Sequence, residues 1–400
     1  MKFAQRTVKT SSAGLDAIFA ASGPNVISFA GGYPDATLFP EHAMQAAFSE
    51  SFAQHSGSLL QYSTTAGYLP LREKLADRMN RRDHLNLKAD DILLTQGAQQ
   101  GIDLTARLLL DKGDGVIVEG PTYIGGLAAF DAYEPTYYEV PIEEDGMDIT
   151  KLQKALMQHQ VKLIYTIPDF QNPTGTVMSV EKRQAMVQLA NQYDVVILED
   201  SPYRDLRYTG ENLPTIKSFD TEGRVISLGS FSKILAPSLR LGWLTAAPEL
   251  LAALTALKAA ADVESSHLVA VAVDTFMNDN DLDAHIDAMK QVYQTKRDAM
   301  LNALERYMPK DVHFNHPDGG FFLWLTLPEG FDMQHFMTAE LLPEYNVSLV
   351  PSHHLYASKS IENGARLNFT NVSEATIESG IKMLGQALND ALHPAQVNQI

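Results

Sequence analysis

Five short apolar runs, each rich in β-branched residues, constrain the fold of this chain more than any other feature. They cover residues 91–95, 115–119, 161–166, 195–198 and 225–228. Segments with helical periodicity lie between several of them, for example residues 99–110 and 180–193. Strands that are apolar on both faces are typical of parallel sheets covered by helices on both sides. The pattern therefore predicts an α/β fold built on a mostly parallel sheet.

The C-terminal third has a different pattern. Residues 282–308 form one long amphipathic segment, and strand-like and helix-like segments then alternate up to residue 392. Such an order indicates a smaller α+β domain joined to the first by a long helix. The first 40 residues are rich in loop-forming residues. We therefore expect an N-terminal arm over 1–40 that packs on the small domain and the functional site, a large domain over 41–290 and a small domain over 291–400.

Composition excludes several classes of protein. The net charge of −18 disfavours binding to a nucleic-acid backbone, and the absence of cysteine excludes disulfides and thiolate chemistry. The N-terminus lacks the apolar core of a secretory signal, and the apolar stretch at 250–263 is interrupted by Lys258 and is too short to span a bilayer. We expect a soluble cytoplasmic protein that contacts neither nucleic acid nor membrane.

Residues that could bind a ligand or take part in a reaction follow each of the five apolar runs. Ligands of open α/β sheets bind at the carboxyl ends of the strands, so these residues are expected at one edge. In chain order they are Gly97, Ala98 and Gln99, then Tyr123, then Asn172, then Asp200 and Tyr203, and finally Ser230, Ser232 and Lys233.

Each of these residues also has an ordinary structural explanation. Asn172 starts a good turn sequence, Asp200 suits a helix cap, and Tyr123 could fill the rim of the sheet. Together, however, they match the needs of pyridoxal 5′-phosphate. A desolvated lysine can form a Schiff base with its aldehyde, a carboxylate can pair with its ring nitrogen, and a helix N-terminus with hydroxyls and a cation can bind its phosphate.

The same residues carry a resemblance to a known family. The chain is similar to the class I/II aminotransferases of fold type I, and most similar to the 2-aminoadipate, kynurenine and aromatic aminotransferase branch. The matching motifs include residues 28–32, 60–63, 171–175 and 230–233, and Arg366. The resemblance implies a mostly parallel seven-stranded sheet sandwiched by helices, with a smaller α+β domain, and a two-step exchange of an amino group between an L-amino acid and a 2-oxo acid.

The resemblance also implies roles for individual residues. Lys233 would bind the cofactor covalently and move the substrate α-proton, Asp200 would pair with the ring nitrogen, and Tyr123 would stack on the ring. Asn172 and Tyr203 would bind the phenolic oxygen. The phosphate ligands would be Gly97, Ala98, Gln99, Ser230, Ser232 and Arg240. Tyr62 would reach the phosphate of a neighbouring subunit, which implies a homodimer with shared active sites.

The substrate would be bound by Arg366, which grips the α-carboxylate, together with Gly32 and Asn172. Relatives that use 2-aminoadipate tend to carry an arginine in the N-terminal arm, where this chain has Leu15. An uncharged pocket rejects a second carboxylate because an unpaired buried charge is costly. We therefore expect an aromatic or aliphatic amino donor, with 2-oxoglutarate as acceptor.

Two alternatives share the scaffold. A β-lyase or decarboxylase would use the same cofactor, and an amino-acid sensor related to the MocR-type regulators would use the same fold. The sensor would require an N-terminal DNA-binding domain, which we do not expect because the resemblance begins near residue 10. We expect no metal site at His313 and His316. On a strand, the adjacent His353 and His354 would point to opposite faces. We expect Phe321, Phe322 and Trp324 in the core of the small domain.

Overall fold

The computed structural model describes residues 2, 4, 23 and 25–394. Its centre is an eight-stranded sheet. In spatial order the strands are β2 (Ile92–Thr95), β9 (Gly242–Thr245), β8 (Val225–Ser230), β7 (Val196–Asp200), β6 (Val161–Thr166), β3 (Gly115–Gly120), β4 (Thr136–Glu143) and β5 (Gly146–Met147). The five strands from β8 to β4 are parallel, and β9 is antiparallel to both β8 and β2, so β2 points the same way as β8. The predicted seven-stranded sheet is confirmed, and the two-residue β5 is an addition to it.

Both faces of this sheet are covered by helices. On β3, Val116 and Val118 pack with the helices of one face, whereas Ile117 packs with those of the other, because side chains alternate along a strand. The first face is covered by α5 (Ala98–Leu109), α6 (Ile124–Asp131) and α9 (Pro248–Asp262), and the second by α7 (Ile149–Gln158) and α8 (Val180–Tyr193). Burial on two sides explains why the strands are continuously apolar in the sequence.

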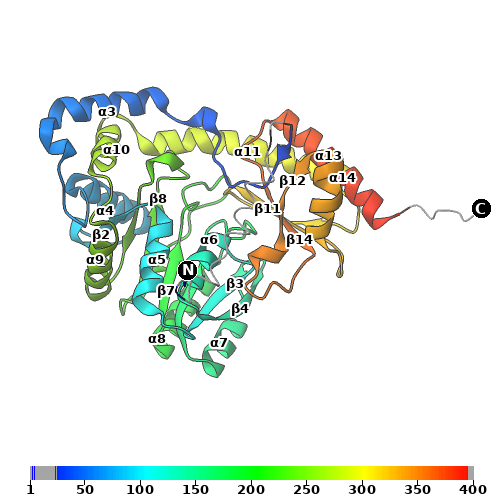
Figure 1. Cartoon of the computed structure of the whole chain (residues 1–400), viewed down its shortest axis with the longest axis horizontal. Coiled ribbons are helices and arrows are strands. Elements are labelled where there is room, and N and C mark those ends of the chain that lie inside the picture. The colour runs from blue at the N-terminus through cyan, green and yellow to red at the C-terminus, as the bar shows by residue number, and fades with distance from the viewer. Residues whose placement is uncertain (1, 3, 5–22, 24, 395–400) are drawn as a thin grey trace, which may run out of the picture.

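The longest helix, α11 (Leu282–Tyr307), links the two main parts of the molecule (Figure 1). It begins where the side chain of Asp281 accepts hydrogen bonds from two backbone N–H groups of the first turn. Its first half buries Ile286 and Met289 with the large sheet's core, and its second half buries Met300 and Leu304 in a separate C-terminal core. Its first half shares the large sheet's core with residues of α3 (Glu41–His55), α4 (Leu69–Asp83) and α10 (His267–Asp279).

The C-terminal part contains a second sheet. Its four strands, in spatial order, are β10 (His313–Phe314), β11 (Phe322–Thr326), β14 (Gly364–Asn368) and β13 (Val350–Pro351). Its helices are α12 (Met333–Phe336), α13 (Leu342–Tyr345) and α14 (Glu374–Leu392). The N-terminal strand β1 (Ile27–Ser28) pairs in parallel with β12 (Val347–Ser348).

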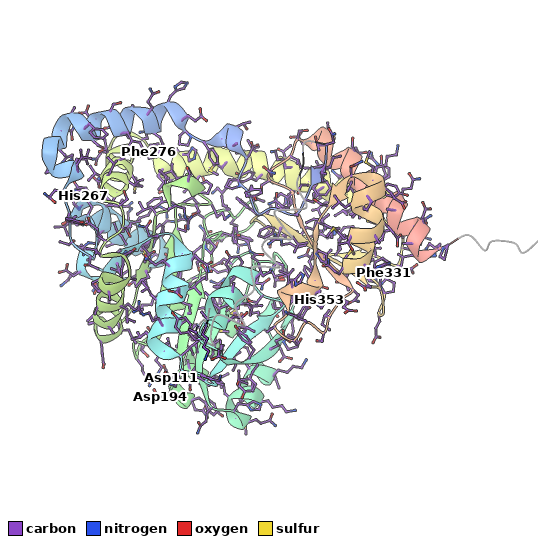
Figure 2. The ribbon with its side chains drawn as sticks, viewed as in Figure 1. Asp111, Asp194, His267, Phe276, Phe331 and His353 are labelled. Carbon is purple, nitrogen blue, oxygen red and sulfur yellow. The ribbon has the colours of Figure 1, made fainter. Side chains whose placement is uncertain are left out.

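Figure 2 shows how far apart the two cores lie. Phe276, on α10, belongs to the core beside the large sheet, and Phe331 packs against the C-terminal core on the opposite side of the molecule. The boundaries expected at residues 40 and 290 remain a prediction.

Single turns of tighter or wider helix connect the main elements. They are η1 (Ala36–Leu38), η2 (Ser56–Leu60), η3 (Ala89–Asp91), η4 (Lys217–Phe219), η5 (Pro237–Leu239), the π-helical η6 (Met337–Leu341) and η7 (Ser352–Leu355). Within the described part of the chain, no helix combines the length and apolarity needed to cross a bilayer.

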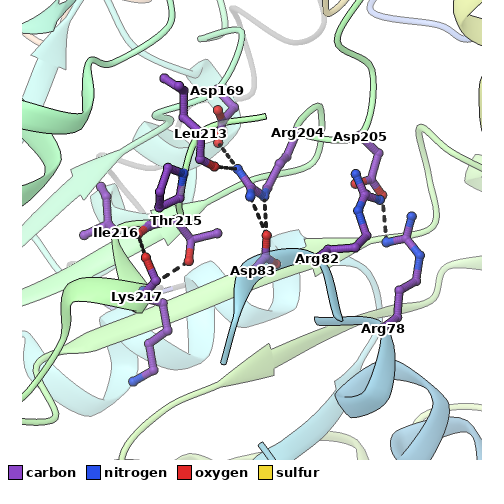
Figure 3. A network of polar contacts seen from close by, with 12 residues as sticks. Arg78, Arg82, Asp83, Asp169, Arg204, Asp205, Leu213, Thr215, Ile216 and Lys217 are labelled. Carbon is purple, nitrogen blue, oxygen red and sulfur yellow. Dashed lines mark hydrogen bonds and ion pairs between the residues drawn. The ribbon is translucent and has the colours of Figure 1, made fainter. Parts of the chain in front are cut away.

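A buried network of ion pairs fixes the loop that follows β6. Arg183 on α8 is fully buried, and its Nη2 lies 2.7 Å from Oδ1 of Asp169. Arg204 donates to Asp83 and lies 3.4 Å from Asp169 (Figure 3). Burial alone would raise the pKa of Asp169, but the charges of Arg183 and Arg204 outweigh it and lower that pKa. The network therefore anchors the backbone three residues before Asn172.

We expect Arg183→Met to destabilise the protein by about 3–5 kcal/mol, because it leaves the buried Asp169 with a single, longer ion pair. Urea unfolding followed by circular dichroism measures the change. Lys112→Met is the matched control, since it breaks an exposed pair with Glu134 and should cost less than about 1 kcal/mol. Equal losses in both variants would contradict the structural role of the network.

Candidate active site

A cavity of about 240 Å³ lies at the carboxyl ends of the parallel strands. It is also bordered by residues of the N-terminal segment and of the four-stranded sheet. Most of the residues singled out in the sequence line it. These are Gly32, Ala98, Gln99, Tyr123, Asn172, Asp200, Tyr203, Ser230, Ser232, Lys233, Arg240 and Arg366.

One end of the cavity is built to receive an anion. Helix α5 starts at Ala98 without a side-chain cap, so its first N–H groups are available to a ligand. The hydroxyl of Ser232 accepts hydrogen bonds from Ser230 Oγ at 3.0 Å and from Arg240 Nη1 at 3.3 Å. Two hydroxyls, a guanidinium and a helix N-terminus therefore converge where a phosphate would bind.

Gly97 does not line the cavity, but it makes this arrangement possible. Its φ of +73° is one that glycine adopts most easily, and a Cβ there would lie 2.6 Å from Nη2 of Arg240. Any larger residue would displace the guanidinium from its hydrogen bond to the carbonyl of Gln96. Its predicted role as a direct cofactor ligand stays a prediction.

Lys233 lies in the turn directly after β8. Its Nζ donates a hydrogen bond to the carbonyl of Gly32 at 2.7 Å and lies 5.5 Å from the centre of the Phe321 ring. Burial lowers its pKa to about 8, and the positive charges of Arg366 and Arg240 add to this shift. A lysine of this kind has a substantial neutral fraction near neutral pH, as a nucleophile or proton acceptor requires.

Asp200 ends β7 and is 3% exposed. Its Oδ2 accepts a hydrogen bond of 2.9 Å from the hydroxyl of Tyr165, whereas its Oδ1 is buried and has no partner among the described residues. Burial raises the pKa of Asp200 to about 6, against the lowering effect of the hydrogen bond from Tyr165. An unpartnered buried carboxylate oxygen is costly unless a ligand supplies a donor.

Arg366 reaches the cavity from β14 of the second sheet. Its Nη1 donates to Oδ1 of Asn172 at 2.8 Å, its Nη2 donates to the carbonyl of Ala30, and its guanidinium lies 4.3 Å from the centre of the Phe322 ring. Burial lowers its pKa to about 10, although the phenols of Tyr203 and Tyr123 oppose that shift. Its partners among the described residues are an amide and a carbonyl, and its Nε is buried without a partner, so it is available to an anionic ligand.

Two tyrosines complete the wall. The hydroxyl of Tyr123 donates to Oε1 of Gln99 at 3.3 Å, and burial raises its pKa to about 12. Burial also raises the pKa of Tyr203, whose ring lies in the core with Phe321 and Phe322. Both phenols therefore stay protonated and can donate hydrogen bonds at neutral pH.

Tyr62, like Gly97, is a predicted site residue that does not line this cavity. The side chain of Tyr62 is 80% exposed, on the outer surface near η2. Leu15 lies outside the described residues, so its expected contact with substrate stays a prediction.

One expectation about aromatic residues was wrong. Phe321 and Phe322 were expected in the core of the small domain, but they pack in the core beside the large sheet, with Tyr203, and Phe322 also lines the cavity. His353 and His354 lie in the 3₁₀ helix η7 rather than on a strand, and their rings meet edge to face at 5.1 Å. His353 is labelled in Figure 2, in the C-terminal part of the molecule.

Sequence reasoning missed Tyr165, Phe322 and Ala30 as parts of the site. Tyr165 carried a usable signal, since it is the one residue with a polar side-chain tip that faces the same side of β6 as the apolar Leu163. The carbonyl of Ala30 carried no signal, because any residue could supply it.

Comparison with known proteins agrees with this geometry. Residues 25–384 match the family model described as aminotransferase class I and II. The chain is 40% identical to aromatic-amino-acid aminotransferase 1 of Thermococcus litoralis, over 92% of this chain and 89% of that protein. It is 34% identical to the 2-aminoadipate transaminase of Thermus thermophilus, over 92% and 91% of the two chains.

Solved structures give the same result. The kynurenine aminotransferase of Pyrococcus horikoshii superposes with a TM-score of 0.93 at 37% identity, covering 98% of this chain and 97% of that one. The fold is that of an α/β enzyme of fold type I, and Lys233 lines its cavity at the carboxyl ends of the strands. The chain belongs to the class I and II aminotransferase family, so its activity is amino-group transfer, and membership implies pyridoxal 5′-phosphate as cofactor.

We expect Lys233 of the cofactor-free protein to react with cyanate along a pH curve with a midpoint near 8, because only the neutral amine reacts. Peptide mass spectrometry measures carbamylation of each lysine, with the exposed Lys154 as reference. Arg366→Met should shift the midpoint upward, since it removes a positive charge that disfavours protonation. Arg306→Met, on the exposed face of α11, is the control. An unchanged curve in Arg366→Met would contradict the electrostatic cause.

Proposed function

We propose that this chain is a pyridoxal 5′-phosphate-dependent aminotransferase that moves the amino group of an aromatic or aliphatic L-amino acid to a 2-oxo acid such as 2-oxoglutarate. One observation supports the proposal above all. Lys233, Asp200 and Arg366 line a single cavity, all three are largely buried, and none forms an ion pair with another described residue. Three ionisable groups that line one cavity without an ionic partner among the described residues indicate a site that a charged ligand completes.

The residues present fit this cofactor. The buried, unpartnered Oδ1 of Asp200 can accept a hydrogen bond from a cationic ring nitrogen. The start of α5, with Ser230, Ser232 and Arg240, can bind a phosphate. Lys233 lies within the same cavity and can bind the aldehyde covalently.

When bound, the cofactor supplies a ring that accepts the electron pair left by the departing α-proton. Asp200 would keep the ring nitrogen protonated, because a carboxylate beside the nitrogen stabilises its positive charge. Nζ of Lys233, with a pKa near 8, would accept the α-proton and deliver it to the cofactor carbon in the first half of the cycle, and would carry a proton in the reverse direction in the second half. Tyr203 and Asn172 would donate hydrogen bonds to the phenolic oxygen, and Tyr123 would stack on the ring.

The cations of the cavity support the expected substrate class. Lys233, Arg240 and Arg366 are the cationic residues among the described lining. Arg240 lies at the phosphate end and Lys233 is the reacting amine, so Arg366 is left for the α-carboxylate. The remaining lining includes Tyr33, Ile124 and Phe322, which favour an apolar or aromatic side chain.

The role predicted for Tyr62 requires a homodimer in which each active site contains residues of both subunits. Tyr62 and Leu60 are 80% and 71% exposed, and Phe52 on the preceding helix is 49% exposed, which suits a surface buried by a second copy. Tyr62 would then reach the phosphate site of the partner. The cytoplasmic location expected from the sequence also stays a prediction.

A steady-state assay with a panel of donors and 2-oxoglutarate tests the proposed function. We expect the highest kcat/KM for aromatic or aliphatic donors and the parallel double-reciprocal lines of a ping-pong cycle. Lys233→Ala should lower kcat by orders of magnitude and remove the cofactor's covalent link. A preference for 2-aminoadipate or aspartate, release of pyruvate without an acceptor, or full activity in Lys233→Ala would each overturn part of the proposal.

Arg366→Ala should lower kcat/KM for every amino donor, chiefly through KM, because the buried carboxylate of the substrate loses its partner. The fall corresponds to a loss of about 2–4 kcal/mol in transition-state stabilisation. Arg366→Lys should recover part of this loss, since it keeps the charge but not the two-pronged contact. Cofactor affinity should change little in both variants. A KM that is unchanged across the panel would show that another group binds the carboxylate.

A further inference from the structure

Tyr165 makes a contact with Asp200 that the proposed roles do not use. The tyrosine lies on β6 and is fully buried, and its hydroxyl donates to Oδ2 of Asp200 at 2.9 Å. Oδ1 of the same carboxylate has no partner among the described residues, and Asp200 lines the cavity. The two oxygens are therefore divided, with one bound to the protein and the other available to a ligand.

The ring of Tyr165 is confined so that its hydroxyl can take few other places. Phe130 packs against it edge to face, with centroids 5.4 Å apart. Gly126 of α6 also lies close to the ring. A Cβ on this glycine would be 2.9 Å from Cε1 of Tyr165 and 3.3 Å from its hydroxyl oxygen. A closely packed buried ring changes rotamer at high cost, so the donor is held in front of the carboxylate.

We propose that Tyr165 is a positioning residue that keeps Asp200 ionised and turned so that Oδ1 is presented to the ring nitrogen of the cofactor. This inference rests on the proposed function, because it assumes that the nitrogen binds Asp200. A phenol that donates to one oxygen stabilises the carboxylate relative to the carboxylic acid. It also fixes the carboxylate plane, since rotation about the side chain would break the hydrogen bond.

The electrostatic surroundings agree with this role. Among the described residues, four titratable groups interact electrostatically with Asp200, namely Tyr165 on β6, Tyr123 before α6, Tyr203 after β7 and Glu119 on β3. Burial, together with the charge of Asp200, raises the pKa of Tyr165 well above its usual value, so its hydroxyl remains a donor. Burial raises the pKa of Asp200 to about 6 even with this hydrogen bond. Without the hydroxyl, the carboxyl group would take up a proton nearer to neutral pH.

The test is the pH dependence of cofactor affinity, measured by equilibrium dialysis of pyridoxal 5′-phosphate with the cofactor-free protein. Protonation of Asp200 removes its attraction for the cationic nitrogen, so affinity falls as pH falls through the pKa of Asp200. In Tyr165→Phe we expect this fall to begin about one pH unit higher, with a dissociation constant about 2-fold larger at pH 7, roughly 10-fold larger at pH 5 and little changed at pH 9. Titrations of the cofactor itself are common to all variants and cancel in the comparison.

Tyr137→Phe is the matched control. Tyr137 also donates its hydroxyl to an aspartate, Asp131 Oδ1 at 2.8 Å, but the pair lies outside the cavity. This variant loses an equivalent hydrogen bond and should leave the affinity curve unchanged. Thermal unfolding of both variants shows whether the fold is retained. Gly126→Ala, which presses on the ring of Tyr165, should shift the curve in the same direction and serves as the second variant if Tyr165→Phe does not fold.

A double-variant comparison separates positioning through Asp200 from a direct effect. In the Asp200→Asn background, residue 200 cannot titrate, so adding Tyr165→Phe should produce no further shift of the curve. An equal shift in both backgrounds would overturn the inference, as would an unchanged curve in Tyr165→Phe. If the unaltered protein binds no pyridoxal 5′-phosphate, the proposed function fails instead.

Discussion

The shared direction of the strands from β8 to β3 is the constraint on which the cavity depends. The carboxyl ends of parallel strands lie at the same edge of the sheet, so strand pairing alone brings together side chains that are far apart in the sequence. Asp200 and Lys233 are placed in this way, by β7 and β8. Arg366 is the exception, because it comes from the second sheet. Its hydrogen bond to Asn172 therefore joins two separately built parts of the molecule.

The charge of the cavity contrasts with that of the chain. The protein has a net charge of −18, yet the described cavity lining carries three cationic residues and one carboxylate. Unpaired buried cations lower the stability of the free protein, and a ligand with two anionic groups removes that cost. Cofactor and substrate binding should thus contribute to the stability of the folded state, because they bind the folded chain alone.

Periodicity predicted those parts of the fold that are buried on both sides. The five apolar runs all became strands, and the segment at 282–308 became α11 within one residue of its predicted end. The strands β4 and β9 were missed for local reasons. Only Val140 of the eight residues of β4 is buried, and β9 is a four-residue strand that begins with glycine. Their apolar signal was too weak to separate them from loops.

The candidate site was predictable where a residue directly follows a strand, as Asp200 and Lys233 do. Tyr165 was not, since its meeting with Asp200 depends on the register between β6 and β7. In that register Tyr165 is paired with Leu198, which places it beside the end of the neighbouring strand. Phe321 and Phe322 were misplaced because Phe322 opens strand β11 of the second sheet and Phe321 directly precedes it, while their side chains pack with Tyr203 in the other core. A single sequence shows which residues are buried, but not which of two cores receives them.

The continuity of α11 has a mechanical consequence. Its 26 residues contain neither proline nor glycine, and they cross from one core to the other over about 39 Å. A helix without these residues is stiff, so we expect the second sheet to move by rotation about the helix and not by bending of the helix. Lys233 and Asp200 are held by strands of the large sheet, whereas Arg366 lies on a strand of the second sheet. Such a rotation would change the distance between Arg366 and Lys233, whereas the distance between Lys233 and Asp200 would stay constant. Binding of the amino acid could thus change without a change in the geometry of the reacting groups.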